Sequence, residues 1–108
     1  MSKFHSLRVQ DVRQETGETV SLALEVPAAL TSDFEYIQGQ YLTLKLTVNG
    51  EELRRSYSIC SAANEPELRI AVKRVPDGRA STFLTRAVSA GDTMEVMPPM
   101  GNFYTELS

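Results

Sequence analysis

The side chains best suited to chemistry are concentrated near the middle of the chain, at residues 54–61. Arg54 and Arg55 are followed by Ser56-Tyr57-Ser58-Ile59-Cys60-Ser61, which brings guanidinium groups, a phenol ring and hydroxyls into one short stretch. A core strand does not carry so many polar groups without partners for them. This stretch therefore favours a flat, anionic ligand.

A second candidate site is the start of a predicted helix. Gly78-Arg79-Ala80-Ser81 leads into Thr82-Phe83-Leu84, and Ser81 is a good N-cap residue. The N–H groups and positive end of a helix attract phosphate. Arg55 can clamp a phosphate through two hydrogen bonds, and strand alternation puts it on the same face as Tyr57. The alternative is purely structural, because most capped helices bind nothing and Tyr57 would also suit a core or cross-strand aromatic.

Charge is unevenly distributed along the chain. The formal net charge is -3, but residues 54–86 carry seven cations and three acids, a local balance of +4 that leaves -7 elsewhere. A mildly acidic protein with such a basic island suits a small anion better than a long nucleic acid. The alternative is a solvated basic face. The seven cations are Arg54, Arg55, Arg69, Lys73, Arg74, Arg79 and Arg86.

Hydrophobic alternation predicts a mainly β chain with six short strands and one short helix. The Asn49-Gly50 dipeptide predicts a tight primed turn between the third and fourth strands. We expect a single domain over residues 1–108, folded as a six-stranded antiparallel Greek-key barrel. Closing the sheet into a barrel leaves fewer strand edges with unpaired backbone groups. The predicted strands lie around residues 7–10, 20–26, 41–48, 53–59, 68–73 and 93–97, and the helix around residues 81–88.

Several classes of site are excluded by residue type. The glycines form neither a GxGxxG nor a GxxxxGK pattern, so no dinucleotide fingerprint or P-loop is present. With Cys60 and His5 the only residues of their kinds, we expect no metal site and no Cys–His or Ser–His catalysis. We interpret Cys60 as a small buried residue, and the alternative is a redox thiol, because Cys60 lies next to the polar stretch. A lone cysteine and the lack of a long apolar run predict a cytoplasmic protein that does not enter a membrane.

Four motifs together resemble the FAD-binding domain of the ferredoxin-NADP reductase superfamily over the whole chain. They are Arg55-Ser56-Tyr57-Ser58, Gly39-Gln40-Tyr41, Gly78-Arg79-Ala80-Ser81 and Pro99-Met100-Gly101-Asn102-Phe103. Residues 4–7, 42–45 and 50–55 are similar to the reductases of bacterial phenylacetate degradation. Gln38 and Asp77 depart from the usual pattern, in which proline and glycine are common at these positions.

The resemblance implies a role for each residue of the motifs. Arg55 would hold the FAD pyrophosphate, Tyr57 would pack on the isoalloxazine ring, and the hydroxyl of Ser58 would approach the flavin N5 region as the catalytic group. The cofactor-binding set implied is Arg55, Ser56, Tyr57, Ser58, Val72, Lys73, Gly78, Arg79, Ala80 and Ser81. FAD is favoured over FMN. Strand alternation puts Ser58 on the opposite face from Tyr57, so Ser58 would need a twist, a bulge or a backbone contact to reach the ring.

The resemblance also implies partners. Relatives continue into an NAD(P)-binding domain and, in some, an iron-sulfur domain, which are absent from this chain; electrons would pass from nicotinamide through flavin to an iron-sulfur centre or an oxygenase component. One rival hypothesis is a non-enzymatic barrel that binds single-stranded nucleic acid by stacking on Tyr41 and Tyr57. Another is a module whose basic island docks an acidic protein.

Overall fold

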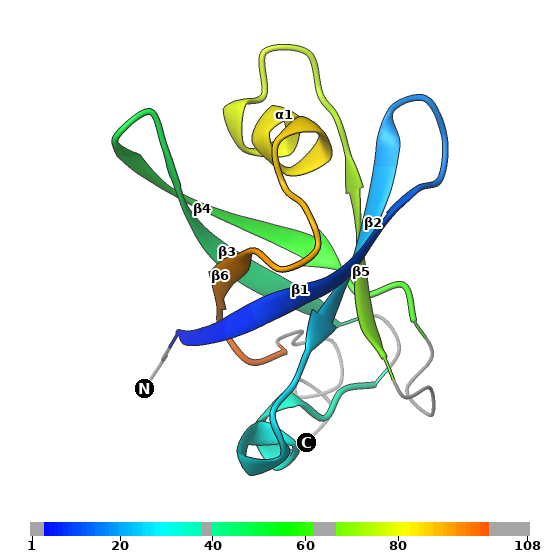
Figure 1. Ribbon diagram of the computed structural model, residues 1–108, viewed down its shortest axis with the longest axis vertical. Helices are drawn as coiled ribbons and strands as arrows, with labels where there is room; N and C mark the ends of the chain where they lie inside the picture. Colours follow the sequence, from blue (N-terminus) through cyan, green and yellow to red (C-terminus); the bar gives the residue numbers. More distant parts are fainter. Residues whose placement is uncertain (1–3, 38–39, 62–66, 100–108) are drawn as a thin grey trace, which may run out of the picture.

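Six antiparallel strands form one curled sheet in the order β4-β3-β6-β1-β2-β5 (Figure 1). The computed structural model describes residues 4–37, 40–61 and 67–99. The predicted mainly β barrel with one short helix is confirmed, and the barrel is half open. The elements are β1 (His5–Gln14), β2 (Thr19–Glu25), 3-10 helices at Ala28–Leu30 and Ser32–Phe34, β3 (Tyr41–Val48), β4 (Glu51–Ser58), β5 (Leu68–Lys73), α1 (Arg79–Arg86) and β6 (Thr93–Val96).

The β3–β4 hairpin forms at the turn that the sequence predicts. Asn49 and Gly50 have φ angles of 53° and 80°, the left-handed values that a primed two-residue turn requires. From that turn the register runs without a shift from the Val48–Glu51 pair to the Tyr41–Ser58 pair. The turn chemistry therefore determines which side chains of β4 lie opposite those of β3.

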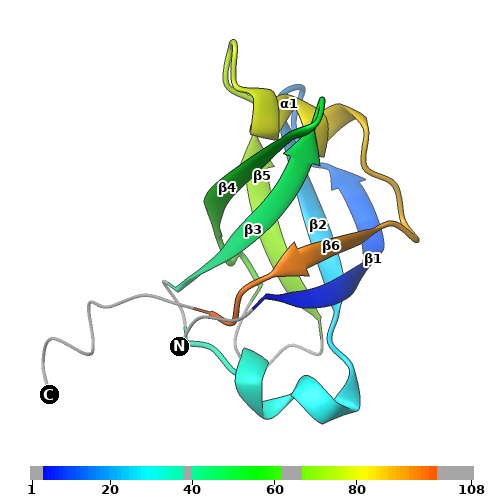
Figure 2. The same cartoon turned by 90° about the vertical axis from the view of Figure 1, so that its left-hand side faces the viewer.

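The barrel encloses one core, and α1 closes one of its ends. Ala80 and Leu84 of the helix are buried, and Figures 1 and 2 show α1 lying across one end of the barrel, where it packs near β2, β3 and β5. The predicted apolar positions of the strands are buried. Ser21 and Ala23 of β2, expected on a wetter face, are buried as well, and Arg69 of β5 covers this side by donating a hydrogen bond to Ser21. Side chains with less than 2% exposure include Leu7, Val9, Val20, Leu22, Leu24, Leu42, Leu44, Ile70, Val72, Leu84 and Val96.

Two predictions about single residues are wrong. The helix begins at Arg79 with Gly78 as its N-cap, whereas Ser81 lies in the first turn and its Oγ accepts a 3.0 Å hydrogen bond from the Val75 N–H. The tight turn before the helix, with Asp77 at a φ of 64°, lets the helix start earlier than the Ser81 cap would. Cys60 is exposed rather than buried, because it lies just beyond the end of the edge strand β4.

Some expected features lie outside the described residues. These are Gln38 and Gly39, upstream of β3, and the Met100–Phe103 part of the last motif. Within the ranges that the structure describes, no helix has the length and apolar character needed to cross a membrane.

Candidate functional site

The two edge strands of the sheet, β4 and β5, meet at one end only. An isolated bridge joins Ile59 to Ile70, and the Cys60 N–H donates a 2.8 Å hydrogen bond to the Arg69 carbonyl. Away from this junction, β4 pairs only with β3, and β5 pairs only with β2, within the residues described. The facing edges of β4 and β5, which have no partner strand among the described residues away from this junction, form a seam.

Alternate residues of β4 point their backbone N–H and C=O groups toward the seam. Ile59 donates its N–H to the Gln40 carbonyl beside β3 at 3.1 Å, whereas the next residue, Cys60, donates toward β5. Since hydrogen-bonded and non-bonded pairs alternate along an antiparallel ladder, residues at even positions of β4 turn their N–H and C=O groups away from β3. The residues concerned are Glu52, Arg54, Ser56 and Ser58. Among the described residues, these groups have no partner strand along the seam, and the Arg54 carbonyl accepts a 2.8 Å hydrogen bond from the Arg55 guanidinium.

Arg55 and Tyr57 extend from the face of β4 that looks into the barrel. Arg55 lies opposite Leu44 and Tyr57 lies opposite Leu42, and directly opposed residues share a face. Tyr57 is half-buried and packs on the core, whereas Arg55 is exposed. Burial raises the pKa of the Tyr57 phenol, and the nearby Arg55 charge partly opposes that shift. An aromatic ring and a guanidinium therefore lie side by side at the seam.

The start of α1 lies close to the hairpin end of β4. Glu51, the first residue of β4, forms an ion pair with Arg79, the first residue of α1. The hydrogen bond and charge of Arg79 lower the pKa of the Glu51 carboxyl, and the charge of Arg55 adds to this effect. The same hydrogen bond raises the pKa of Arg79. The two candidate stretches are thus linked in space through Glu51.

The first turn of α1 keeps its amide donors free of side-chain caps. The first intrahelical hydrogen bond runs from the Thr82 N–H to the Gly78 carbonyl at 3.0 Å, so the N–H groups of Arg79, Ala80 and Ser81 precede it. A Cβ on Gly78 would lie 2.8 Å from the Ser81 Oγ and 3.1 Å from the Val75 carbonyl oxygen. Only glycine fits there without displacing neighbours, and the bare helix start suits an anion.

Other residues predicted for the site lie apart from this face. The Ser56 hydroxyl forms a 2.9 Å hydrogen bond with the Thr43 hydroxyl on the outer face of the hairpin, and Ser58 is exposed opposite Tyr41. The ladder has no bulge, so both hydroxyls stay on the face opposite Tyr57. Ser58 can reach the seam through its backbone. On β5, the Val72 side chain is buried in the core and Lys73 is exposed at the strand end.

The basic island of the sequence does not form one surface. Arg69 is only 5% exposed and forms ion pairs with Asp11 and Glu67, whereas Arg54 pairs with Glu52 at 3.0 Å on the outer face. The two tyrosines of the nucleic-acid hypothesis, Tyr41 and Tyr57, belong to opposite faces of the hairpin. Neither a shared stacking platform nor a continuous cationic patch is formed by these residues.

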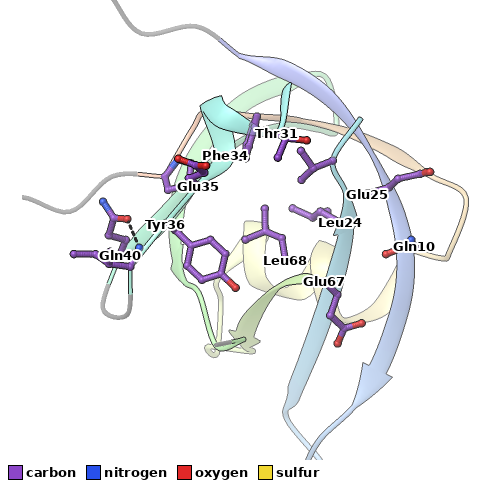
Figure 3. A pocket seen from close by; sticks show the side chains of 13 residues that line it. Gln10, Leu24, Glu25, Thr31, Phe34, Glu35, Tyr36, Gln40, Glu67 and Leu68 are labelled. Atoms are coloured by element: carbon purple, nitrogen blue, oxygen red, sulfur yellow. Dashed lines mark hydrogen bonds between the residues drawn. The ribbon is translucent and has the colours of Figure 1, made fainter. Parts of the chain in front are cut away.

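A separate pocket of about 830 Å³ lies near the start of β5 (Figure 3). Its lining includes three carboxylates, Glu25, Glu35 and Glu67, beside the rings of Phe34 and Tyr36. No lysine or arginine is among the described residues that line it. This acidic pocket is unsuited to a phosphate, so the seam is the better anion site.

Two neighbours of the site were not anticipated from the sequence. Glu51 has no motif of its own, and Thr43 is one of several alternating polar residues in β3. The register set by Asn49-Gly50 would have identified Thr43 as the partner of Ser56. The Glu51–Arg79 contact joins residues 28 positions apart, and no local signal predicts it.

Comparison with known proteins identifies the cofactor. The family profile of the oxidoreductase FAD-binding domain matches residues 6–104. The chain belongs to this family. The FAD-binding domain is 43% identical over 103 residues to a component of the 1,2-phenylacetyl-CoA epoxidase of Escherichia coli (strain K12), a match that covers 95% of this chain and 29% of that relative. The superfamily and the finer resemblance predicted from the sequence are both confirmed.

Solved structures support the same fold. A ferredoxin NADP+ reductase from Neisseria gonorrhoeae with bound FAD and NADP has a TM-score of 0.77 at 22% identity, covering 94% of this chain and 39% of that one. Phthalate dioxygenase reductase, described as a modular structure for electron transfer from pyridine nucleotides to [2Fe-2S], has a TM-score of 0.73 at 29% identity, covering 91% and 30%. The FAD-binding domain thus spans less than half the length of these relatives.

Proposed function

We propose that this FAD-binding domain is the flavin unit of an NAD(P)H-dependent reductase that supplies electrons to an iron-sulfur centre or an oxygenase component in phenylacetate or other aromatic degradation. Its similarity to a phenylacetyl-CoA epoxidase component and to phthalate dioxygenase reductase supports this role. The nicotinamide site and the electron acceptor would belong to further domains or to partner proteins. A lone cysteine fits a reducing cytoplasm.

The observation that carries the proposal is that the start of α1 lies against the hairpin end of β4, the strand whose inner face carries Arg55 and Tyr57. Arg55 is exposed, Arg79 is linked to the same strand through Glu51, and the first-turn amides of α1 have no side-chain cap. Two guanidinium groups and free helical N–H groups are the donors that a diphosphate requires. We assign the FAD pyrophosphate to these groups.

The flavin ring would be held by an aromatic face and by backbone groups. Tyr57 offers a half-buried ring beside the phosphate donors, where stacking contributes about 0.5–1.5 kcal/mol beyond burial. The seam-facing backbone groups of Ser56 and Ser58 would hydrogen-bond the polar edge of the ring. This assignment gives Ser58 its role through the main chain rather than through the hydroxyl, because the hydroxyl faces outward. Lys73 would line the other side of the seam, because odd-numbered residues of β5 turn their backbone groups away from β2, whereas Val72 pairs with Val20 of β2.

FAD would supply hydride acceptance and single-electron release. The chain's own residues would bind and orient that group. Arg55 would neutralise phosphate charge, and Tyr57 would shield one face of the ring from water. The unpaired N–H groups on the β4 edge provide fixed donors near the ring.

Titration of the purified chain with FAD, followed by flavin fluorescence, tests the proposal. The wild-type domain is expected to give a saturable change, and Arg55→Ala to weaken FAD binding about 10- to 100-fold, because hydrogen bonds to charged groups contribute about 1.5–3 kcal/mol. Arg54→Ala is the matched control, since Arg54 is the adjacent arginine but pairs with Glu52 on the outer face. The absence of saturation in the wild type, or equal affinity in Arg55→Ala, would refute the flavin site.

A further inference from the structure

Glu51 occupies a distinct position at the far end of the proposed binding face. By strand alternation Glu51, Arg55 and Tyr57 share one face of β4. At about 3.3 Å per residue, Glu51 lies about 13 Å from Arg55 and about 20 Å from Tyr57 along the strand. A flavin with its ring at Tyr57 and its first phosphate at Arg55 would therefore direct its distal portion toward Glu51.

Among the described residues, Arg79 is the only ion-pair partner recorded for the Glu51 carboxylate, and the charge of Arg55 acts on the same carboxylate from farther along the strand. The side chains of Glu51 and Arg79 are 56% and 48% exposed, so their ion pair is well solvated. Exposed ion pairs contribute little to stability and can exchange partners readily. Arg79 is thus held near the seam by an anion that a phosphate could replace.

We propose that Glu51 is a specificity-determining residue that competes with the distal phosphate of the cofactor for Arg79. This inference rests on the proposed function. In the absence of ligand, Glu51 neutralises Arg79; when a dinucleotide binds, Arg79 exchanges the carboxylate for the phosphate, and the freed carboxylate stays nearby as an unfavourable charge. Glu51 thereby limits the affinity for FAD more than the affinity for FMN, whose single phosphate reaches only as far as Arg55.

The chain contains a matched control for this idea. Glu52 is the next residue of the same hairpin, and its side chain is 53% exposed. Alternation puts Glu52 on the outer face, where it pairs with Arg54 at 3.0 Å. Neutralising Glu52 makes the same change in net charge without touching the Arg79 pair.

The test compares FAD and FMN titrations of the wild type, Glu51→Gln, Glu52→Gln, Arg79→Ala and the Glu51→Gln/Arg79→Ala double variant. Glu51→Gln is expected to tighten FAD binding about three- to five-fold, the range that an exposed ion pair allows, and FMN binding less than about two-fold. Glu52→Gln should leave both affinities unchanged. In the Arg79→Ala background, Glu51→Gln should no longer tighten FAD binding, since the two residues act on each other.

Each other result is decisive. Unchanged or weaker FAD binding by Glu51→Gln, an equal gain for FMN, or an equal gain in the Arg79→Ala background would overturn the competition. A wild-type domain that shows no saturable FAD binding would instead overturn the proposed function, and this inference with it. Circular dichroism verifies folding of each variant, and Glu51→Ser serves as a second neutral variant if Glu51→Gln does not fold.

Discussion

Arg55 lies directly opposite Leu44 across the β3–β4 ladder, so an exposed guanidinium shares a face with a side chain that has no exposed surface. Both residues point toward the inside of the barrel, but β4 is an edge strand whose far side has no partner along most of its length within residues 4–37, 40–61 and 67–99. The Arg55 side chain therefore reaches solvent where a central strand would have buried it. The binding face exists because the barrel does not close between β4 and β5.

Replacing Tyr57 should weaken flavin binding without abolishing it. Tyr57→Leu removes the stacking face but keeps an apolar side chain against the core, so FAD affinity is expected to fall about 2- to 10-fold. Fluorescence titration measures the change. Tyr41→Leu is the control, because Tyr41 lies on the opposite face of the hairpin. Equal losses in the two variants would mean that Tyr57 does not contact the ring.

Gly78→Ala should disturb the start of α1. The added Cβ would lie 2.8 Å from the Ser81 Oγ, which accepts a hydrogen bond from the Val75 N–H, so one of these groups must move. We expect a loss of about 1–3 kcal/mol in the free energy of unfolding, measured by urea denaturation, and weaker FAD binding. Gly17→Ala should change neither quantity, because nothing lies within 4 Å of a Cβ there. A free energy of unfolding in Gly78→Ala equal to that of the wild type would show that the turn accommodates the added Cβ without cost.

Arg69→Met should destabilise the fold far more than Arg13→Met. The Arg69 guanidinium is buried, where it donates to the Ser21 hydroxyl at 2.6 Å and pairs with Asp11 and Glu67. Removing one partner of a buried, hydrogen-bonded charge network costs about 2–4 kcal/mol when the carboxylates remain partly solvated. Arg13 also approaches Asp11, at 3.7 Å, but it is exposed and should contribute less than about 1 kcal/mol. Thermal and urea unfolding compare the two, and equal losses would contradict the burial argument.

Asp11 should give the domain an acid-sensitive contribution to stability. The hydrogen bond from Arg69 lowers the pKa of the Asp11 carboxyl below its ordinary value of 3.8. A lowered native pKa means that this stabilisation is present above pH 3.8 and is lost as the pH falls through the native value. Asp11→Asn should therefore be less stable than the wild type at pH 6, and the difference should shrink at pH 3.

Urea unfolding at the two pH values measures this difference. Asp33→Asn, a change at an exposed aspartate in the second 3-10 helix, serves as the control and should differ little from the wild type at either pH. A gap between wild type and Asp11→Asn that stays constant from pH 6 to pH 3 would show that the Arg69–Asp11 pair does not set the acid response.

Local patterns in the sequence determined much of the fold. Alternation along β3 predicted which side chains are buried, and Asn49-Gly50 predicted the hairpin, because both signals act over neighbouring residues. Alternation failed at Ser21 and Arg69, which are buried because they hydrogen-bond to each other across β2 and β5.

The predicted helix start was wrong because the turn at Asp77-Gly78 allows the helix to begin at Arg79. The Ser81 hydroxyl accepts a hydrogen bond from the Val75 N–H and does not cap the helix. The predicted burial of Cys60 was wrong, because alternation along a strand does not show whether that strand lies at the edge of the sheet.

By itself, the sequence determined that Arg55 and Tyr57 share a face and that a short helix follows the turn before Gly78, although it placed the N-cap at Ser81. Only the tertiary structure decided that the two stretches are linked by the ion pair between Glu51 and Arg79. It also decided that Arg69 is part of a buried network with Asp11 and not of an exposed basic surface. These contacts join residues far apart in the chain, whose proximity depends on how far the sheet curls and where it stays open. No pattern within a single strand or helix encodes that curvature.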